Sequence, residues 1–235
     1  MQVPWRQLLL TLPPVKLGMH KQRHFVDHLI EEGYLRTPKL ITVILSIDRS
    51  DFGCTESPFN PCPIGHEESL SAFNVHAMAC EALYPALVRP NAHILDVGCG
   101  SGYLTAVFAR LNPSATVYGV DCKPEMIEVA QRSLAKEHGD LMRASRIVLH
   151  TSDGAQGYPP GAPYDAIHVG VAVESLPETL LQQLRGDGIL VAPVGPPNVI
   201  QDLVTVTKKG ELTKKMTAKS MAFVRFEPMI PAFPQ

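Results

Sequence analysis

An apolar run that ends in three alternating glycines constrains this chain more than any other feature. In "HILDVGCGSGYLTAVF" the run 93–97 is typical of a short buried strand, and the apolar residues after the glycines recur at helical spacing. The glycines therefore form the turn between a strand and a helix. Gly98, Gly100 and Gly102 allow a ligand to approach the backbone N–H groups where a Cβ atom would block it. The pattern predicts a nucleotide site at this turn.

Strands and helices alternate from residue 93 onward, which predicts an α/β fold with a doubly wound, mostly parallel, Rossmann-like sheet. Beyond residue 197, "IQDLVTVTKKGELTKKM" reads as a strand, a turn and a return, and "AFVRFEPM" as one more strand. We expect these later strands to pair antiparallel at one edge of the sheet. The expected parallel strands are 93–97, 116–120, 147–150, 166–171 and 189–194, and the expected helices are 102–111, 124–136 and 177–185.

The N-terminal part predicts helices and a loop in front of this sheet. An apolar stripe begins at residue 24 and ends at Gly33, and a second helix over 37–46 has Thr37 as its N-cap. We expect 1–23 to be a flexible extension of one domain that spans 24–235. That domain divides into N-terminal helices with a loop (24–90) and a ligand-binding core with the C-terminal strands (91–235).

The segment 48–71, rich in proline and glycine, predicts a long irregular loop. Long loops inside compact domains usually carry function. Ser71 can cap a further helix that runs to about Leu83, and Pro85 ends or kinks that helix.

Composition excludes several classes of protein. The chain has 235 residues, 45% of them hydrophobic, and a formal net charge of −2, so it lacks the basic excess of a nucleic-acid-binding protein. No apolar run is long enough to span a membrane. Its five cysteines contain no C-x-x-C pair, which predicts neither a disulfide framework nor a zinc site. We expect a cytoplasmic monomer, with organellar targeting by the basic segment 1–26 as a minority alternative.

The spacing of the glycines selects among nucleotides. A dinucleotide turn has a third glycine at position 103, where this chain has Tyr103, so a nicotinamide dehydrogenase is disfavoured. Asp96 precedes the turn, and Asp121 ends the next strand, where a carboxylate can accept both hydroxyls of a ribose. S-adenosylmethionine carries a sulfonium and an ammonium instead of phosphates, and therefore suits these acids. The alternative is that both aspartates are only turn residues at strand ends.

A second acidic pair follows the third expected strand in "HTSDGAQGY". Asp153 can accept the exocyclic amine of adenine, and Gly154 lets the ring lie against the backbone. The alternative interpretation is a type I′ turn, for which Asp-Gly is a common choice.

Several segments resemble the protein-L-isoaspartate (D-aspartate) O-methyltransferase family, over about residues 24–230. "HFVDHLIEEGYLRTPKLITVILSIDRSDF" is similar to the helices that lead into the family's Asp-Arg signature. "PIGHEESLSAFNVHAMACEAL" is similar to its substrate loop, and "ILDVGCGSGYLTA" to its cofactor turn. "SDGAQGYPPGAPYDAIHVGVA" and "LVAPVGP" match farther on. The substrate loop and "YDAIHVG" are the most specific of these motifs.

The resemblance implies a class I methyltransferase that takes S-adenosylmethionine, yields S-adenosylhomocysteine and needs no metal. It implies Ser71 and Ser69 as catalytic residues. The implied substrate-binding residues are Ile64, Gly65, His66, Ser69, Ser71 and His76, and the implied cofactor-binding residues are Asp96, Gly98, Cys99, Gly100, Ser101, Gly102, Asp121, Cys122, Asp153 and Gly154.

The reaction implied by the resemblance is methylation of the free α-carboxylate of L-isoaspartyl residues in damaged proteins, with D-aspartyl residues as a further substrate. The ester then collapses to a succinimide that can reopen as normal aspartate. A carboxylate is already ionised at neutral pH, so the catalyst mainly aligns it and excludes water. We therefore expect His76 to be a core histidine, Asp48 and Arg49 to form a structural ion pair, and His168 to line the site without acting as a base.

The chain departs from the family in the substrate loop. Glu67 and Glu68 replace small or neutral residues, and each would repel a substrate carboxylate by about 1 kcal/mol unless it points to solvent. Phe73 replaces a proline. These changes leave open a methyltransferase with a different acceptor, or a cofactor-binding protein that has lost transfer activity.

Overall fold

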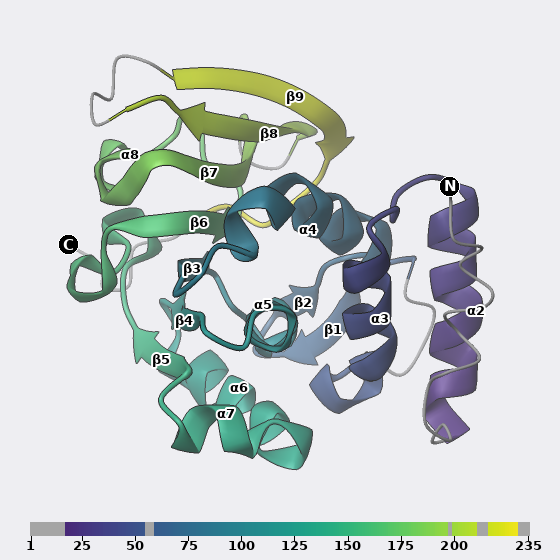
Figure 1. Cartoon of the computed structure of the whole chain (residues 1–235). Helices are drawn as coiled ribbons and strands as arrows, with labels where there is room; N and C mark the ends of the chain where they lie inside the picture. The colour runs from purple at the N-terminus through teal and green to yellow at the C-terminus, as the bar shows by residue number, and fades with distance from the viewer. Residues whose placement is uncertain (1–16, 55–58, 197–198, 211–215, 230–235) are drawn as a thin grey trace.

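The computed structural model describes residues 17–54, 59–196, 199–210 and 216–229. Its centre is a seven-stranded sheet with the strand order β5-β4-β3-β6-β7-β8-β9 (Figure 1). The pairs from β5 to β7 are parallel, and β7–β8 and β8–β9 are antiparallel. The strands are β3 (His93–Val97), β4 (Thr116–Asp121), β5 (Ile147–Thr151), β6 (Tyr164–Val169), β7 (Leu184–Val194), β8 (Gln201–Lys208) and β9 (Met216–Val224). The predicted α/β class and its antiparallel edge are confirmed.

Helices cover both faces of the sheet, because each central strand alternates buried side chains between two hydrophobic clusters. Ile94 packs in the cluster that includes residues of α3, α4 and α5, whereas Leu95 packs in the cluster that includes α8. No helix of the described part is long and apolar enough to cross a membrane. The helices are α2 (Leu17–Glu31), α3 (Pro38–Ser46), α4 (Phe73–Leu87), α5 (Tyr103–Leu111), α6 (Pro124–Glu137), α7 (Gly139–Arg143) and α8 (Glu178–Gln183).

The first described helix begins earlier than the sequence predicted. α2 starts at Leu17, inside the segment expected to be a flexible extension, and ends at Glu31. The rest of that extension lies outside the described residues. Thr37 occupies the N-cap of α3 as predicted, but its hydroxyl makes no capping bond and donates instead to Glu81 of α4 at 2.8 Å.

The expected irregular loop 48–71 contains regular structure. A short 3₁₀ helix, η2 (Arg49–Phe52), precedes an antiparallel hairpin of β1 (Cys62–Gly65) and β2 (Glu68–Leu70). These strands have four and three residues, too few for a periodic signal. We call residues 62–70 the substrate hairpin, after the resemblance of this segment.

Two expectations around this hairpin are wrong. Cys54 and Cys62 form a disulfide, with their Cα atoms 5.3 Å apart, although the cysteine spacing predicted none. The fold brings them together by folding β1 back toward η2, which no local motif announces. The helix α4 begins at Phe73 with Ala72 as its N-cap, so Ser71 is not a cap, and the helix continues through Pro85 to Leu87.

The C-terminal strands also differ in detail from the prediction. "AFVRFEPM" is not a separate strand, because β9 is long and includes its first three residues. After β9 the chain pairs with Ala172, which donates its N–H to Glu227 and accepts from Met229. This contact joins the C-terminal segment to the loop after β6.

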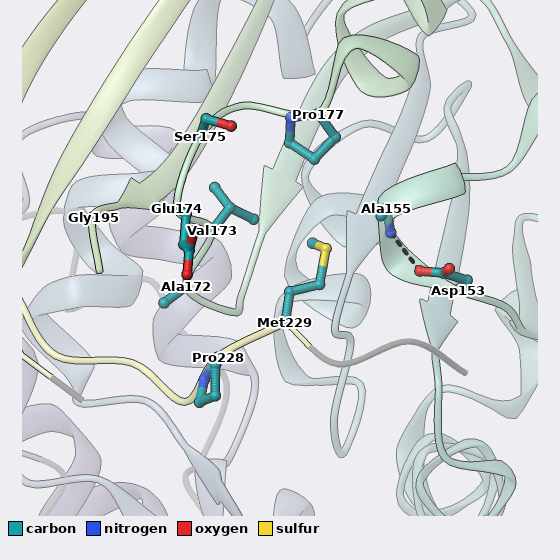
Figure 2. Close-up of a pocket in the computed structure, with 10 residues that line it drawn as sticks. All are labelled: Asp153, Ala155, Ala172, Val173, Glu174, Ser175, Pro177, Gly195, Pro228 and Met229. Atoms are coloured by element: carbon teal, nitrogen blue, oxygen red, sulfur yellow. Dashed lines mark hydrogen bonds between the residues drawn. The ribbon is translucent and has the colours of Figure 1, made fainter. Parts of the chain in front are cut away.

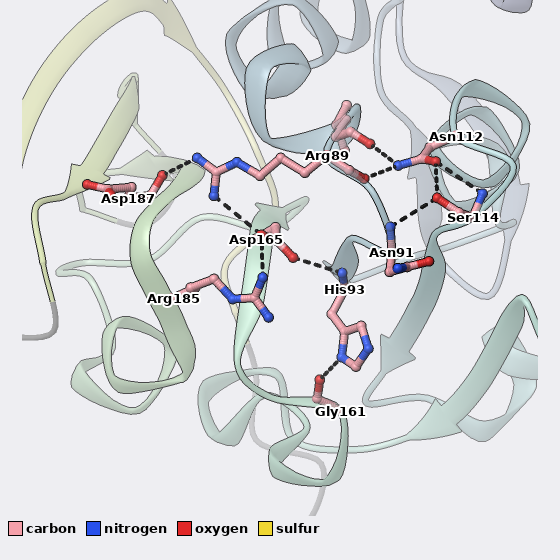
Figure 3. Close-up of polar contacts among 10 residues, drawn as sticks. Arg89, Asn91, His93, Asn112, Ser114, Gly161, Asp165, Arg185 and Asp187 are labelled. Carbon is pink, nitrogen blue, oxygen red and sulfur yellow. Dashed lines mark hydrogen bonds and ion pairs between the residues drawn. The ribbon is translucent and has the colours of Figure 1, made fainter.

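A buried carboxylate holds the amino ends of the strands together. Asp165, which is fully buried, accepts from the backbone N–H of His93 at 3.0 Å (Figure 3). Its other oxygen accepts from Arg89 at 3.3 Å and from Arg185 at 3.0 Å. Arg89 also donates to the carbonyl of Asp187. The arrangement fixes β3, β6 and β7 at the end of the sheet that is opposite to the glycine turn.

We expect Asp165→Asn to lower the free energy of unfolding by about 1.5–3 kcal/mol, since it removes charge-assisted hydrogen bonds from a buried group. Urea denaturation measures this loss. Asp187→Asn is the matched control, because Arg89 contacts only the backbone carbonyl of Asp187. Equal stability of the two variants would contradict the assignment.

Candidate active site

The turn between β3 and α5 requires its glycines. Gly98, Gly100 and Gly102 have φ values of 69°, 55° and 86°, in the left-handed region that favours glycine. The N–H groups of Gly98 and Cys99 both donate to the carbonyl of Val120 at the end of β4. The turn is therefore closed against the neighbouring strand. A Cβ atom at Gly98 or Gly102 would also press against Val171 or Leu134, so close packing adds to the need for glycine at these two positions.

Asp96 lies at the carboxyl end of β3 and is 1% exposed. Its two oxygens accept from the hydroxyl of Thr105 at 2.6 Å and from Nδ1 of His168 at 2.8 Å. Because Nδ1 of His168 donates to a carboxylate, this ring is oriented by Asp96. His168 lines the site, in accord with the interpretation that it is not a free base.

Asp121 ends β4, the strand next to β3. It accepts from the N–H of Gly100 and from the N–H of Lys123, each at 3.1 Å. Burial raises the pKa of Asp121, and these two backbone donors oppose that shift. A carboxylate has further lone pairs beyond those two bonds, so Asp121 keeps acceptor capacity for hydroxyl groups.

Three further residues are expected to contact the cofactor: Cys99, Ser101 and Cys122. Burial raises the pKa of Cys99 well above its usual range, and Asp96 and Asp121 raise it further. Burial, Asp121 and Glu68 raise the pKa of Cys122. Both residues therefore remain neutral thiols. The hydroxyl of Ser101 is buried and has no hydrogen-bond partner among the described residues.

A pocket forms where the substrate hairpin meets the glycine turn. Its walls come from the hairpin, from the N-terminal part of α4, from the glycine turn and from the end of β6. Of the residues predicted to bind substrate or cofactor, this pocket brings together Ile64, Ser69, Ser71, His76, Asp96, Gly98, Cys99 and Gly100. Leu70, Tyr103, Leu104, His168 and Gly170 complete its lining.

A buried guanidinium stands behind this pocket. Arg49 is 3% exposed and donates to the carbonyl of Ser71 at 2.8 Å and to Nδ1 of His76 at 2.9 Å. Its charge lies over the rings of Phe73 and Tyr103, 4.6 and 4.7 Å from their centroids. The predicted Asp48–Arg49 ion pair is wrong: Asp48 instead caps η2 by accepting from Ser50.

Arg49 also determines the proton position on His76. Burial lowers the pKa of His76 well below its usual value, and the charge of Arg49 lowers it further. Arginine can only donate, so Nδ1 of the neutral ring must accept and the proton lies on Nε2. His76 is thus a buried core residue, as predicted, and it is also a neutral N–H donor on the pocket wall.

The structure accounts for two of the departures in the substrate loop. Phe73 is fully buried against Arg49 and does not reach solvent. Glu68 forms an ion pair with Lys123 at 2.7 Å, so its charge is neutralised, and Glu67 is exposed in the hairpin turn. The repulsion expected from this acidic pair is therefore reduced to that of one solvated carboxylate.

Asp153 and Gly154 lie apart from that pocket. Asp153 accepts from the N–H of Ala155 at 2.9 Å and begins a 3₁₀ helix, η3 (Gly154–Gln156), so the alternative of a type I′ turn is wrong. Asp153 lines a second pocket, together with Ala172 and Met229 (Figure 2). This pocket lies at the carboxyl end of the sheet, beside the C-terminal segment.

Sequence reasoning missed several contributors to the site. Tyr103 was noted only as the residue that breaks the dinucleotide pattern, yet its ring stacks on His76 with centroids 5.4 Å apart. Lys123 carried no expectation at all. Its place immediately after Asp121 and Cys122 was the available signal, since residues that follow a β-strand end lie beside the ligand in this type of sheet.

The site places its negative and positive side chains in different regions. The carboxylates of Asp96 and Asp121 lie at the strand ends, where they attract a cationic ligand, and the guanidinium of Arg49 lies behind the serine and histidine donors, where it attracts an anion. Groups of opposite charge thus lie on different sides of a small cavity of about 40 Å³.

Comparisons with known proteins identify the family of the chain. The model of the family described as protein-L-isoaspartate (D-aspartate) O-methyltransferase matches residues 20–230. A protein-L-isoaspartate O-methyltransferase of Triticum aestivum is 38% identical over 90% of this chain and 92% of its own length, and protein-L-isoaspartate O-methyltransferase 1 of Arabidopsis thaliana is 33% identical with the same coverage. A Plasmodium falciparum PCMT structure in complex with S-adenosyl-L-homocysteine gives a TM-score of 0.79 at 24% identity, over 89% of this chain and 98% of that one. By these matches and by its own motifs, the chain belongs to the protein-L-isoaspartate (D-aspartate) O-methyltransferase family.

Proposed function

We propose that this chain methylates the free α-carboxylate of L-isoaspartyl residues in damaged proteins, with Ser69, Ser71 and His76 as the groups that receive this carboxylate. The product ester can then collapse to a succinimide, which starts repair. The observation that carries the assignment is the pocket in which these three residues face Asp96 and the glycine turn.

The side of the pocket that carries the serine and histidine donors suits an α-carboxylate. Such a group is ionised at neutral pH, so no general base is needed to prepare it. The hydroxyls of Ser69 and Ser71 and the Nε2–H of His76 can donate to its oxygens. Arg49 adds a positive charge behind them, and its bond to the carbonyl of Ser71 holds this serine at the pocket wall.

The acidic side of the site suits S-adenosylmethionine, the methyl donor of the family. When bound, this cofactor supplies a methyl group on a positively charged sulfur. Asp96 and Asp121 provide the carboxylates expected for its ammonium and its ribose. Asp153, in the second pocket, is the proposed partner of the adenine amine.

Exclusion of water and alignment are the main contributions of the protein. The donors come from the end of the hairpin, the short link after it and the first turn of α4, so their spacing is fixed by a continuous stretch of backbone. Neutralisation of an anion by a cation is favoured in a site of low dielectric constant. The neutral thiols of Cys99 and Cys122 add no competing nucleophile.

Damaged proteins and peptides are the proposed partners. Monomeric action in the cytoplasm, without nucleic acid or membrane, remains part of the proposal, and organellar targeting by segment 1–26 is the alternative. The formal net charge of −2 supports the absence of a nucleic-acid partner.

The proposed reaction is tested by transfer of labelled methyl from S-adenosylmethionine to a peptide that contains L-isoaspartate. The control is the same peptide with ordinary aspartate. We expect base-labile label on the isoaspartyl peptide alone. Cofactor binding without transfer would exclude this acceptor.

Asp121→Ala should weaken binding of S-adenosylhomocysteine by about 1.5–3 kcal/mol, because hydrogen bonds to a charged acceptor are lost. Isothermal titration calorimetry measures the affinity. Asp121→Asn keeps one acceptor oxygen for the backbone donors and should lose less. Unchanged affinity in Asp121→Ala would remove the ribose assignment.

Ser71→Ala should lower kcat/KM for the isoaspartyl peptide by roughly tenfold or more, the effect of one lost hydrogen bond to a charged group. The affinity for S-adenosylhomocysteine should stay within about twofold, since Ser71 is not on the glycine turn. Steady-state kinetics and calorimetry give the two values. An equal loss in both would make Ser71 a purely structural residue.

A further inference from the structure

Lys123 reaches from the cofactor-binding edge of the sheet to the substrate hairpin. Its Nζ atom lies 2.7 Å from a carboxylate oxygen of Glu68 and donates to the carbonyl of His66 at 2.9 Å. The side chains of Lys123 and Glu68 are 26% and 27% exposed, so this pair is only partly shielded from solvent. One ammonium thus holds both the turn and the second strand of the hairpin.

The backbone of Lys123 serves the other half of the site. Its N–H donates to one oxygen of Asp121, and the second oxygen accepts from the N–H of Gly100 on the glycine turn. Lys123 also occupies the N-cap position of α6. The residue is therefore fixed by its main chain to the proposed ribose site and by its side chain to the proposed peptide site.

The substrate hairpin depends on such external contacts. β1 and β2 have four and three residues, and their register shifts between Pro63 and Gly65. Gly65, His66 and Glu67 all have positive φ values, of 94°, 54° and 64°, which is unfavourable for the two residues that carry a Cβ atom. An isolated two-stranded hairpin is marginally stable in water.

Other charged groups near the Lys123–Glu68 ion pair do not make the same contacts with the hairpin. Glu67 is exposed in the turn, and Lys136 on α6 donates to the carbonyl of Asp51 in η2, outside the hairpin. The side chain of Ile64 lies close to Gly100, so an apolar contact also joins the hairpin to the glycine turn. The ion pair between Lys123 and Glu68 adds a directional polar contact between the same two parts of the chain, and it neutralises the carboxylate of Glu68.

We propose that Lys123 is a positioning residue that holds the substrate hairpin closed over the glycine turn and so couples cofactor binding to peptide binding. A ligand that orders Asp121 and the glycine turn also orders Lys123, and through it the hairpin, which carries Ser69 and is followed directly by Ser71. Coupling between two binding sites is reciprocal, so bound peptide increases affinity for the cofactor by the same factor. The assignment of the hairpin as the peptide site rests on the proposed function, whereas the link to the cofactor site does not.

Hydrogen exchange followed by mass spectrometry tests the link without any peptide. In the wild-type chain, S-adenosylhomocysteine should slow exchange in the glycine turn (98–102) and in the hairpin (62–70). In Lys123→Met, protection of the turn should persist at saturating ligand, and protection of the hairpin should be lost. Lys39→Met, the same substitution at an exposed residue of α3, is the control and should match the wild type.

Kinetics test the consequence. Lys123→Met and Glu68→Gln should each raise KM for an isoaspartyl peptide by about two- to fivefold, in the range of a partly exposed ion pair, while kcat changes less. The exchanged pair Lys123→Glu with Glu68→Lys should recover part of the loss, which a merely local role of either residue would not allow.

The outcomes are distinct. Equal hairpin protection in the wild type and Lys123→Met would overturn the inference, even if the isoaspartyl peptide is methylated. An effect of Lys123→Met that neither Glu68→Gln reproduces nor the exchanged pair reduces would also overturn it, since Lys123 would then act only on Asp121. A third outcome is loss of hairpin protection in Lys123→Met while the wild type fails to methylate the peptide. It would support the link that Lys123 makes between the glycine turn and the hairpin, and it would refute the proposed substrate.

Discussion

The site depends on the contacts made by the buried guanidinium of Arg49. Its partners are the carbonyl of Ser71, the neutral imidazole of His76 and the faces of two aromatic rings. These neutral groups match the geometry of the guanidinium but leave its charge in place. A carboxylate partner would cancel that charge. A positive charge is therefore retained beside the pocket, at the cost of burial that lowers the pKa of Arg49. The same contacts connect η2, the start of α4 and the start of α5, so these elements beside the pocket share one anchor.

Sequence predicted the parts of the molecule that follow from local chemistry. The strand-turn-helix around the glycines, the parallel strands and the positions of Asp96 and Asp121 depend on periodicity and on backbone freedom, which are readable from neighbours in the chain. The substrate hairpin and the disulfide were missed because they depend on tertiary placement. Ser71 was read as a helix cap because a serine before an apolar run usually is one. Arg49 was paired with its neighbour Asp48, whereas the fold turns it toward residues more than twenty positions away.

The departures of the substrate loop are accommodated by different means. Phe73 supplies an aromatic face for Arg49, so the lost proline is replaced by packing. Glu68 is paired across the site with Lys123, so its acidity is cancelled locally. The family reaction is therefore compatible with an acidic hairpin. Two changes that look like loss of function in the sequence are each matched by a partner in the structure.

The wall of the pocket in Figure 2 combines Asp153 with Pro228 and Met229, which are distant in the sequence. The backbone bonds of Ala172 to Glu227 and Met229 hold that wall in place. When the ribosome has just completed the parallel strands, which end with β7, it has not yet synthesised Pro228 and Met229, which close this pocket. A ligand that binds there cannot stabilise the nascent chain by mass action until this segment has emerged. A ligand of this pocket can therefore add stability only after the parallel sheet has been made.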